Sequence, residues 1–215
     1  MRRGRRAYYD KFSRFYDRFV ALHSRDKQSL ARKFLVECIP LRNGGTVLDL
    51  CTGTATLVTH LQAKVGAGGQ VVGLDFSHGM LQAAQEKTRK FTNVHLVEAD
   101  AGSLPFATGS FDAVTCSHAF YELKGETQDR ALQEVVRVLR PEGTFLMMEH
   151  DVPSNPLIKA LYYLRLTLIG GGRAIAFLRR ERELLEQYFA SVEKVAASAG
   201  RSKVMICRKV ARRAY

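Results

Sequence analysis

The chain has 215 residues, of which 46% are hydrophobic, and it carries a formal net charge of +12. This length suits one compact domain, and the composition excludes collagen-like, low-complexity and solenoid architectures. Basic residues gather toward both ends of the sequence. Such charge attracts nucleic acid, anionic lipid headgroups or acidic small molecules, or it marks solvated ends that bind nothing.

Cysteine and histidine usage gives no sign of a metal site. The four cysteines form no CxxC pair, and the six histidines show no zinc-ligand spacing. We therefore expect free, buried thiols in a reducing compartment and no metal. The start lacks the apolar core of a secretory signal, and the longest apolar run, residues 157–169, is short and interrupted by charge. We expect a cytoplasmic protein without a membrane span.

Strand and helix signals alternate through the first two thirds of the chain. Two helices are predicted over residues 8–22 and 27–37, the first with aromatic residues at helical spacing. Then follow strand 46–50, helix 54–65, strand 70–75, helix 79–90, strands 93–97 and 111–116, helix 127–139 and strand 144–149. Pro141 ends the last of these helices. Apolar strands separated by helices predict a parallel sheet covered on both faces.

The last third departs from this alternation. Residues 156–169 predict a strongly apolar helix that ends at three glycines, and a second helix is predicted over 180–189. Two strands, 191–197 and 203–209, are then separated by a link of residues 198–202, which suits a hairpin and adds an antiparallel edge strand. The predicted fold class is an α/β, Rossmann-like, doubly wound sheet, mostly parallel, with a C-terminal antiparallel hairpin strand.

Acidic and small residues stand where the predicted parallel strands end. Asp49 precedes a run of small residues that enters a helix, whose N-terminal N–H groups suit a carboxylate. Asp75 ends the next strand, where an acid accepts hydrogen bonds from a ribose diol, and Asp100 after the third suits an adenine amine. Ser117 and His118 end the fourth strand, at the crevice of a doubly wound sheet.

Together these residues resemble the class I S-adenosylmethionine-dependent methyltransferases of the methyltransferase-11 type, over residues 46–149. Within that superfamily the chain is most similar to the ubiquinone/menaquinone-biosynthesis C-methyltransferases and the bacterial phospholipid N-methyltransferases. The aromatic N-terminal helix with Tyr16, and the string Phe-Ser-His-Gly-Met-Leu at 76–81, carry this closer resemblance. It implies one domain, divided into a helical cap (1–40), a cofactor-binding core (41–150), a substrate-side helical insertion (151–190) and a terminal hairpin with a basic tail (191–215).

The resemblance implies S-adenosyl-L-methionine as cofactor and assigns residues to it. Asp49 and Gly53 would hold its methionine end, Asp75 its ribose, and Asp100 with Ala101 its adenine, while Tyr16 covers the site. The other expected cofactor contacts are Cys51, Thr54, Phe76, Met80 and Ser117. The family's turn has small residues where this chain has Cys51 and Ala55, and Ala55 fits if its φ is negative.

The resemblance also implies a small, apolar or lipid-like acceptor of the quinone-precursor or phospholipid type. The apolar helix and the arginines after it favour work at an anionic membrane surface, although a buried core helix explains the pattern equally well. A base is needed only where the acceptor must lose a proton, and His118, His150 and Glu149 are the candidates nearest the crevice. The chain leaves its oligomeric state open.

Other functions remain as alternatives. A nicotinamide-dependent oxidoreductase requires a Gly-x-Gly-x-x-Gly motif after the first strand, which this chain lacks. An inactive methyltransferase-like protein that binds membrane or RNA through its basic surface is a second alternative. A nucleic-acid methyltransferase is a third, disfavoured because no base-methylation motif is present.

Overall fold

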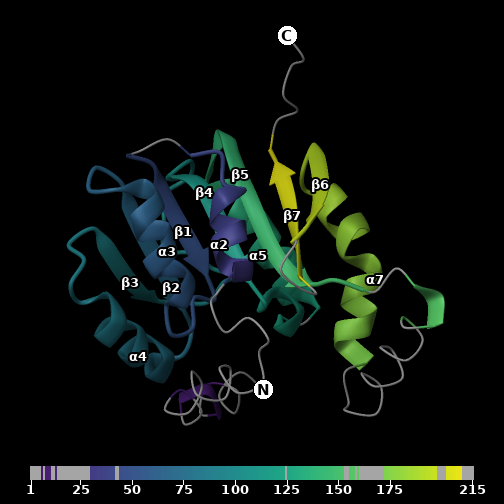
Figure 1. The fold of residues 1–215 in the computed structure, drawn as a ribbon, viewed down its shortest axis with the longest axis horizontal. Helices are drawn as coiled ribbons and strands as arrows, with labels where there is room; N and C mark the ends of the chain where they lie inside the picture. The colour runs from purple at the N-terminus through teal and green to yellow at the C-terminus, as the bar shows by residue number, and fades with distance from the viewer. Residues whose placement is uncertain are drawn as a thin grey trace.

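A computed structural model describes residues 6, 8–10, 13, 30–41, 44–123, 125–152, 155–157, 159, 172–197 and 202–209. These residues build a seven-stranded sheet in the order β3-β2-β1-β4-β5-β7-β6 (Figure 1). The strands are β1 (Thr46–Leu50), β2 (Gln70–Asp75), β3 (Val94–Glu98), β4 (Phe111–Ser117), β5 (Leu139–His150), β6 (Ser191–Ala196) and β7 (Ser202–Arg208). The first five strands are mutually parallel, and β7 pairs antiparallel with both β5 and β6.

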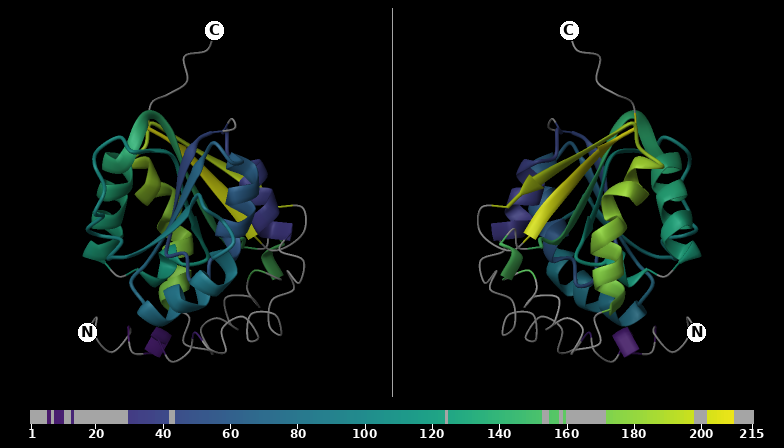
Figure 2. Two further views of the ribbon diagram at one scale, coloured as in Figure 1. Left: turned by 90° about the vertical axis from the view of Figure 1, so that its left-hand side faces the viewer. Right: turned by 90° about the vertical axis from the view of Figure 1, so that its right-hand side faces the viewer.

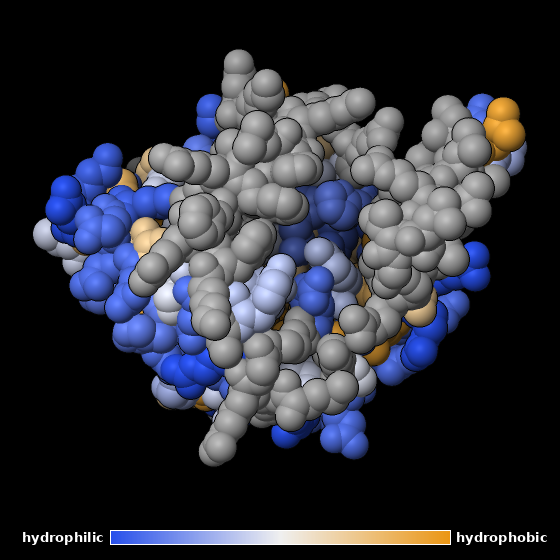
Figure 3. Space-filling model, turned by 90° about the horizontal axis from the view of Figure 1, so that it is seen from below, coloured by the Kyte–Doolittle hydropathy of each residue, from blue (hydrophilic) through white to orange (hydrophobic). Residues whose placement is uncertain are grey.

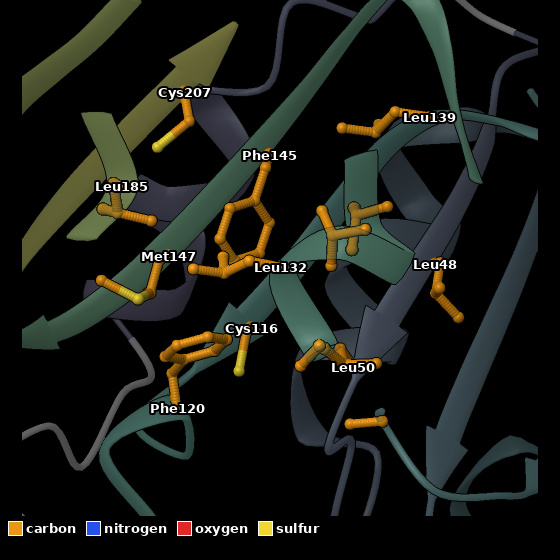
Figure 4. Packing of buried hydrophobic residues seen from close by; sticks show 14 of the residues in the cluster. Leu48, Leu50, Cys116, Phe120, Leu132, Leu139, Phe145, Met147, Leu185 and Cys207 are labelled. Carbon is orange, nitrogen blue, oxygen red and sulfur yellow. The ribbon is translucent and has the colours of Figure 1, made fainter. Parts of the chain in front are cut away.

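Helices cover both faces of the sheet (Figure 2). They are α2 (Leu30–Glu37), α3 (Thr56–Val65), α4 (His78–Thr88), α5 (Glu126–Val138) and α7 (Gly172–Glu186), with a short 3-10 turn, η1 (Phe120–Glu122). One buried cluster joins α2 and α3 to their face of the sheet, and the other joins α5 and α7 to the opposite face (Figure 4). Burial on both faces explains why β1 and β4 read as nearly continuous apolar runs.

The predicted fold class is confirmed, with corrections at three elements. The antiparallel strand is not at the edge: β7 lies between β5 and β6, so β6 forms the edge. Helix α7 begins at Gly172, eight residues before its predicted start. Strand β5 begins at Leu139, which pairs with Phe111 before residues 140–143 bulge and regular pairing resumes at Thr144. A bulge accommodates Pro141, which cannot donate to a regular ladder.

Some predicted elements lie mostly outside the described residues, namely helices 8–22 and 156–169. Within the described ranges, none of the helices has the length and hydropathy of a bilayer-spanning segment.

Candidate active site

A cleft opens at the carboxyl ends of β1 and β4, where the strand order reverses. Ligands of doubly wound sheets bind at this point of the topology. The turn after β1, the start of α3, the end of β4 and Arg32 of α2 line it. Figure 3 views the molecule from the side of these strand ends, where the described residues that are visible are mostly hydrophilic. The sheet topology therefore brings polar groups from distant parts of the sequence to one place.

The turn between β1 and α3 has an unusual backbone. Cys51, Gly53 and Ala55 all have positive φ, at 56°, 56° and 59°. The condition under which Ala55 fits the family's turn, a negative φ, is not met, and the left-handed conformation costs a non-glycine residue about 1–2 kcal/mol. Neighbouring strands hold the turn: the Thr52 N–H donates to Leu74 O at 2.9 Å, and the Gly53 N–H to Asp75 Oδ2 at 2.8 Å. Strain that surrounding contacts maintain is typical of functional turns.

Asp49 is a buried acid at the wall of the cleft. Its side chain accepts hydrogen bonds from Thr52 Oγ1 at 2.7 Å and from Thr115 Oγ1 at 2.9 Å. Burial raises its pKa to about 6, and the two threonine hydroxyls and the charge of Arg32 oppose this rise. Near neutral pH Asp49 is therefore mainly a carboxylate, which suits a cationic ligand group.

Groups that suit an anion lie beside Asp49. Ala55 is the N-cap residue of α3, and its side chain makes no capping hydrogen bond. The first backbone N–H groups of the helix therefore receive no acceptor from the N-cap side chain. Lys87 Nζ lies 2.9 Å from Thr54 Oγ1, at the same end of the helix. Arg32 completes this wall, and sequence reasoning missed it because α2 reaches the cleft only through tertiary packing. An acid next to cationic groups and a helix N-terminus is complementary to an amino acid zwitterion.

Asp75 and Asp100 stand at the ends of β2 and β3 as predicted. Both Asp75 carboxylate oxygens accept backbone hydrogen bonds, from Gly53 at 2.8 Å and from Ser77 at 3.0 Å. Burial nevertheless raises the pKa of Asp75. Asp100 accepts from the Gly102 N–H at 2.9 Å, and the adjacent Ala101 is buried. Neither acid is among the residues that line the cleft; they follow β2 and β3, on the same edge of the sheet as the end of β1.

An N-terminal segment docks beside this edge. Asp10 accepts from Ser77 Oγ at 2.6 Å and from the Gly79 N–H at 3.0 Å, and so caps the start of α4. A Cβ at Gly79 would lie 2.7 Å from the Asp10 backbone, so the close approach requires glycine there. Tyr9 contacts the ring of Phe76 edge-on at 5.8 Å between centroids, and Met80 is buried behind it. Tyr16, predicted to cover the site, lies outside the described residues.

Two predicted histidines come together at the ends of β4 and β5. The rings of His118 and His150 lie 4.6 Å apart between centroids. His118 has a φ of 51°, and its Nδ1 is buried without a hydrogen-bond partner among the described residues, as is Ser117 Oγ. Burial, aided by His150 and Arg32, lowers the pKa of His118 to about 3. His118 is therefore an uncharged imidazole at the cleft, and the ordinary histidine pKa assumed from the sequence does not apply to it.

Glu149 does not line the cleft, and neither does His150, although both were predicted near it. Glu149 is 1% exposed and accepts from the Phe120 N–H at 3.1 Å, which fastens η1 to β5. Glu149 stands opposite Lys203 of β7 in the sheet. Lys203 forms a buried ion pair with Glu181 of α7, so Glu149 lies on the face of the sheet that α7 covers. Burial raises the pKa of Glu149 to about 8, with a further rise from Glu181. Consecutive strand residues point to opposite faces, so His150 lies on the other face of the sheet from Glu149, beside the ring of His118.

The raised pKa of Glu149 predicts a pH-dependent stability. The folded state keeps a proton that the unfolded state, with a pKa of 4.5, releases. The stabilisation is complete below about pH 4.5 and is lost as the pH rises through about 8. Glu149→Gln keeps an acceptor but cannot ionise. As the pH rises from about 4.5 to about 8, the free energy of unfolding of the variant should increase relative to that of the parent, by up to about 1.4 kcal/mol per pH unit.

Urea unfolding at several pH values measures this difference. Glu86→Gln is the matched control, because the Glu86 side chain is 75% exposed and should show no such trend. Parallel curves for Glu149→Gln and the parent would show that Glu149 ionises normally in the folded protein.

The cleft fits the groups of S-adenosylmethionine. The buried Asp49 carboxylate suits its ammonium group, and the start of α3 with Arg32 suits its carboxylate. The acids at the ends of β2 and β3 lie outside the residues that line the cleft, and their carboxylates suit a nucleoside. The unpartnered Ser117 Oγ and His118 Nδ1 are the buried polar atoms that remain for a ligand to satisfy in this part of the structure.

Comparison with known proteins agrees with this geometry. Demethylmenaquinone methyltransferase of Staphylococcus haemolyticus is 35% identical over 181 residues, which cover 83% of this chain and 75% of that protein. The enzyme of the same name from Staphylococcus aureus strain MRSA252 is 34% identical over 83% of this chain and 74% of its own length.

Solved structures share the fold at lower sequence identity. A SAM-dependent methyltransferase from Aquifex aeolicus superposes with a TM-score of 0.69 at 19% identity, covering 90% of this chain and 98% of that one. The family model described as "ubiE/COQ5 methyltransferase family" matches residues 5–177. The chain thus belongs to the ubiE/COQ5 methyltransferase family, whose cofactor is S-adenosyl-L-methionine.

Proposed function

We propose that this methyltransferase acts on a ring carbon of an apolar, hydroxylated aromatic acceptor of the quinone-precursor type. The observation that carries the proposal is the neutral His118, which lines the cleft and whose buried Nδ1 has no partner among the described residues. A ring carbon becomes nucleophilic when a neighbouring hydroxyl loses its proton, and a neutral imidazole accepts that hydrogen bond. The names of the staphylococcal relatives support the same acceptor class.

The chain's own residues divide the work. Asp49 holds the cofactor's ammonium group, while Arg32 and the start of α3 hold its carboxylate. Asp75 and Asp100 bind ribose and adenine. Bound S-adenosylmethionine supplies a methyl group on a sulfonium. His118 accepts the hydrogen bond from the acceptor hydroxyl, and its low pKa lets it release any proton it receives to the exposed His150 or to water.

The acceptor is tested by direct competition. Vesicles are prepared that contain a reduced, demethylated naphthoquinol with an isoprenoid tail together with phosphatidylethanolamine, and labelled S-adenosylmethionine is added with the enzyme. We expect label in the quinol fraction. Label in the phospholipid fraction would instead support amine methylation, which needs no base because a neutral amine carries its own lone pair.

The cofactor assignment of Asp75 gives a prediction of its own. In Asp75→Asn, one carboxylate oxygen becomes an amide NH₂ that cannot accept, so the side chain can no longer serve Gly53, Ser77 and a ribose diol together. Affinity for S-adenosylhomocysteine should fall by about tenfold or more, since a hydrogen bond to a charged group contributes roughly 1.5–3 kcal/mol. Calorimetry measures the change, and equal affinities would remove Asp75 from the site.

A further inference from the structure

Two cysteines lie near one another where β1 and β4 end, Cys51 at the cofactor cleft and Cys116 in the buried cluster beside it. Strands β1 and β4 are parallel neighbours, and Leu50 stands directly opposite Cys116. Cys51 follows Leu50 and begins the turn that lines the cleft. The Cys51 side chain packs against the buried cluster that contains Cys116, and both cysteines are free. Figure 4 shows Cys116 in the packed cluster, with Leu50 and Phe120 nearby.

The backbone spacing at this pair suits a disulfide. Neighbouring strands are about 4.8 Å apart and rise about 3.3 Å per residue, so the Cα atoms one residue out of register are about 6 Å apart. Disulfides span Cα separations of about 4.4–6.8 Å. The positive φ of Cys51 takes its side chain out of the strand alternation, and it packs against the same cluster that contains Cys116.

The two thiols differ in their exposure to solvent, and we expect the more exposed one to react first. Cys51 is half-buried and lines the cleft, whereas Cys116 is completely buried. A small oxidant that enters the cleft therefore meets Cys51 first, and Cys116 lies behind it. The remaining cysteines offer no comparable pair: Cys38 packs on the α2 face of the sheet and Cys207 on the α7 face.

We propose that Cys51 and Cys116 are a modification site that a peroxide converts to a reversible disulfide, and that this disulfide weakens cofactor binding. The Cys51 thiolate attacks one peroxide oxygen, the O–O bond breaks, and the first water leaves as Cys51 becomes a sulfenic acid. The Cys116 sulfur then attacks the Cys51 sulfur, the S–O bond breaks, and the second water leaves with the Cys116 proton. The peroxide is reduced and the two thiols are oxidised.

The cofactor turn couples the disulfide to binding. A disulfide bond brings its sulfur atoms to about 2.05 Å, well inside the distance of two sulfur atoms in non-bonded packing contact. Since Cys116 is fixed in the packed core, Cys51 must move inward. Cys51 immediately precedes Thr52 and Gly53, whose N–H groups are bonded to Leu74 and Asp75. Oxidation should therefore displace the turn from the geometry that receives the cofactor. The inference rests on the cofactor site and not on the proposed acceptor.

The test begins with the unmodified protein. It is treated with hydrogen peroxide, free thiols are alkylated, and the digest is mapped by mass spectrometry. We expect a linked peptide pair containing Cys51 and Cys116 that a dithiol reductant separates. Affinity of the oxidised protein for S-adenosylhomocysteine should be weaker by roughly tenfold or more and should recover on reduction. Linked peptides that are absent, or an oxidised protein that binds normally, would overturn the proposal.

Variants separate the pair from general oxidation. Cys116→Ala should bind S-adenosylhomocysteine normally and no longer respond to peroxide. Cys207→Ala, the matched control at another buried cysteine, should respond as the parent does. If Cys116→Ala fails to fold, the peptide map and the reversible change in affinity of the parent still decide. Because neither readout uses an acceptor, failure here is distinct from failure of the proposed methyl-acceptor class.

Discussion

Asp49→Asn should weaken binding of S-adenosylhomocysteine by about 100-fold near pH 7.5, because it removes the buried carboxylate that pairs with the ligand's ammonium group. The parent should also show pH dependence. The pKa of Asp49 is about 6 in the ligand-free protein, so binding should weaken as the pH falls below that value and Asp49 becomes neutral. At about pH 5 we expect roughly tenfold weaker binding than on the alkaline plateau.

Calorimetry from about pH 5 to 8 tests this expectation. In Asp49→Asn the pH dependence should disappear, since the amide does not titrate. Methylthioadenosine, which lacks the amino acid end, is the matched ligand: its affinity should change little with pH or with the substitution. A parent curve that is flat across pH 6 would show that Asp49 is not the partner of the ammonium group.

His118→Ala should lower turnover by about 100-fold while leaving cofactor affinity nearly unchanged, which is the usual scale for loss of a group that assists proton transfer. His118 has a pKa of about 3, so it is neutral over the whole working range and should add no inflection near pH 6.5. The acidic decline of kcat/KM should instead follow Asp49 and persist in the residual activity of His118→Ala.

His95→Ala is the matched control, because His95 is an exposed residue of β3 that contacts Gln70 outside the cleft. Single-turnover rates distinguish a chemical defect from slow product release. If His118→Ala stays within a few-fold of the parent, methyl transfer depends on positioning alone, and an amine acceptor becomes the better hypothesis.

Much of the fold follows from local signals in the sequence. Apolar runs separated by helices gave the parallel sheet, and acids at strand ends marked one edge of it. The features that could not be predicted from the sequence depend on backbone conformation or on contacts between distant residues. The sign of φ at Ala55 is set by the bonds that hold the turn and not by the residue itself. Either Glu149 or His150 could lie on the side of His118, because a sequence pattern indicates the alternation of a strand but not which face each residue takes.

Arg32 shows a different limit. Nothing in its local sequence points to a ligand, since a basic residue on an amphipathic helix is normally solvated. It reaches the cleft only because α2 packs against α3. A basic residue in the helix that precedes the first strand is the signal that a sequence search could have used.

The position of β7 also determines when the sheet can close during synthesis. Strand β6 is made first, yet its sheet partner is β7 and not β5. Until residues 202–208 leave the ribosome, the edge of β5 has no neighbour, and unpaired strand edges favour association with other chains. Emergence of β7 therefore completes two pairings together, that of β7 with β5 and that of β7 with β6.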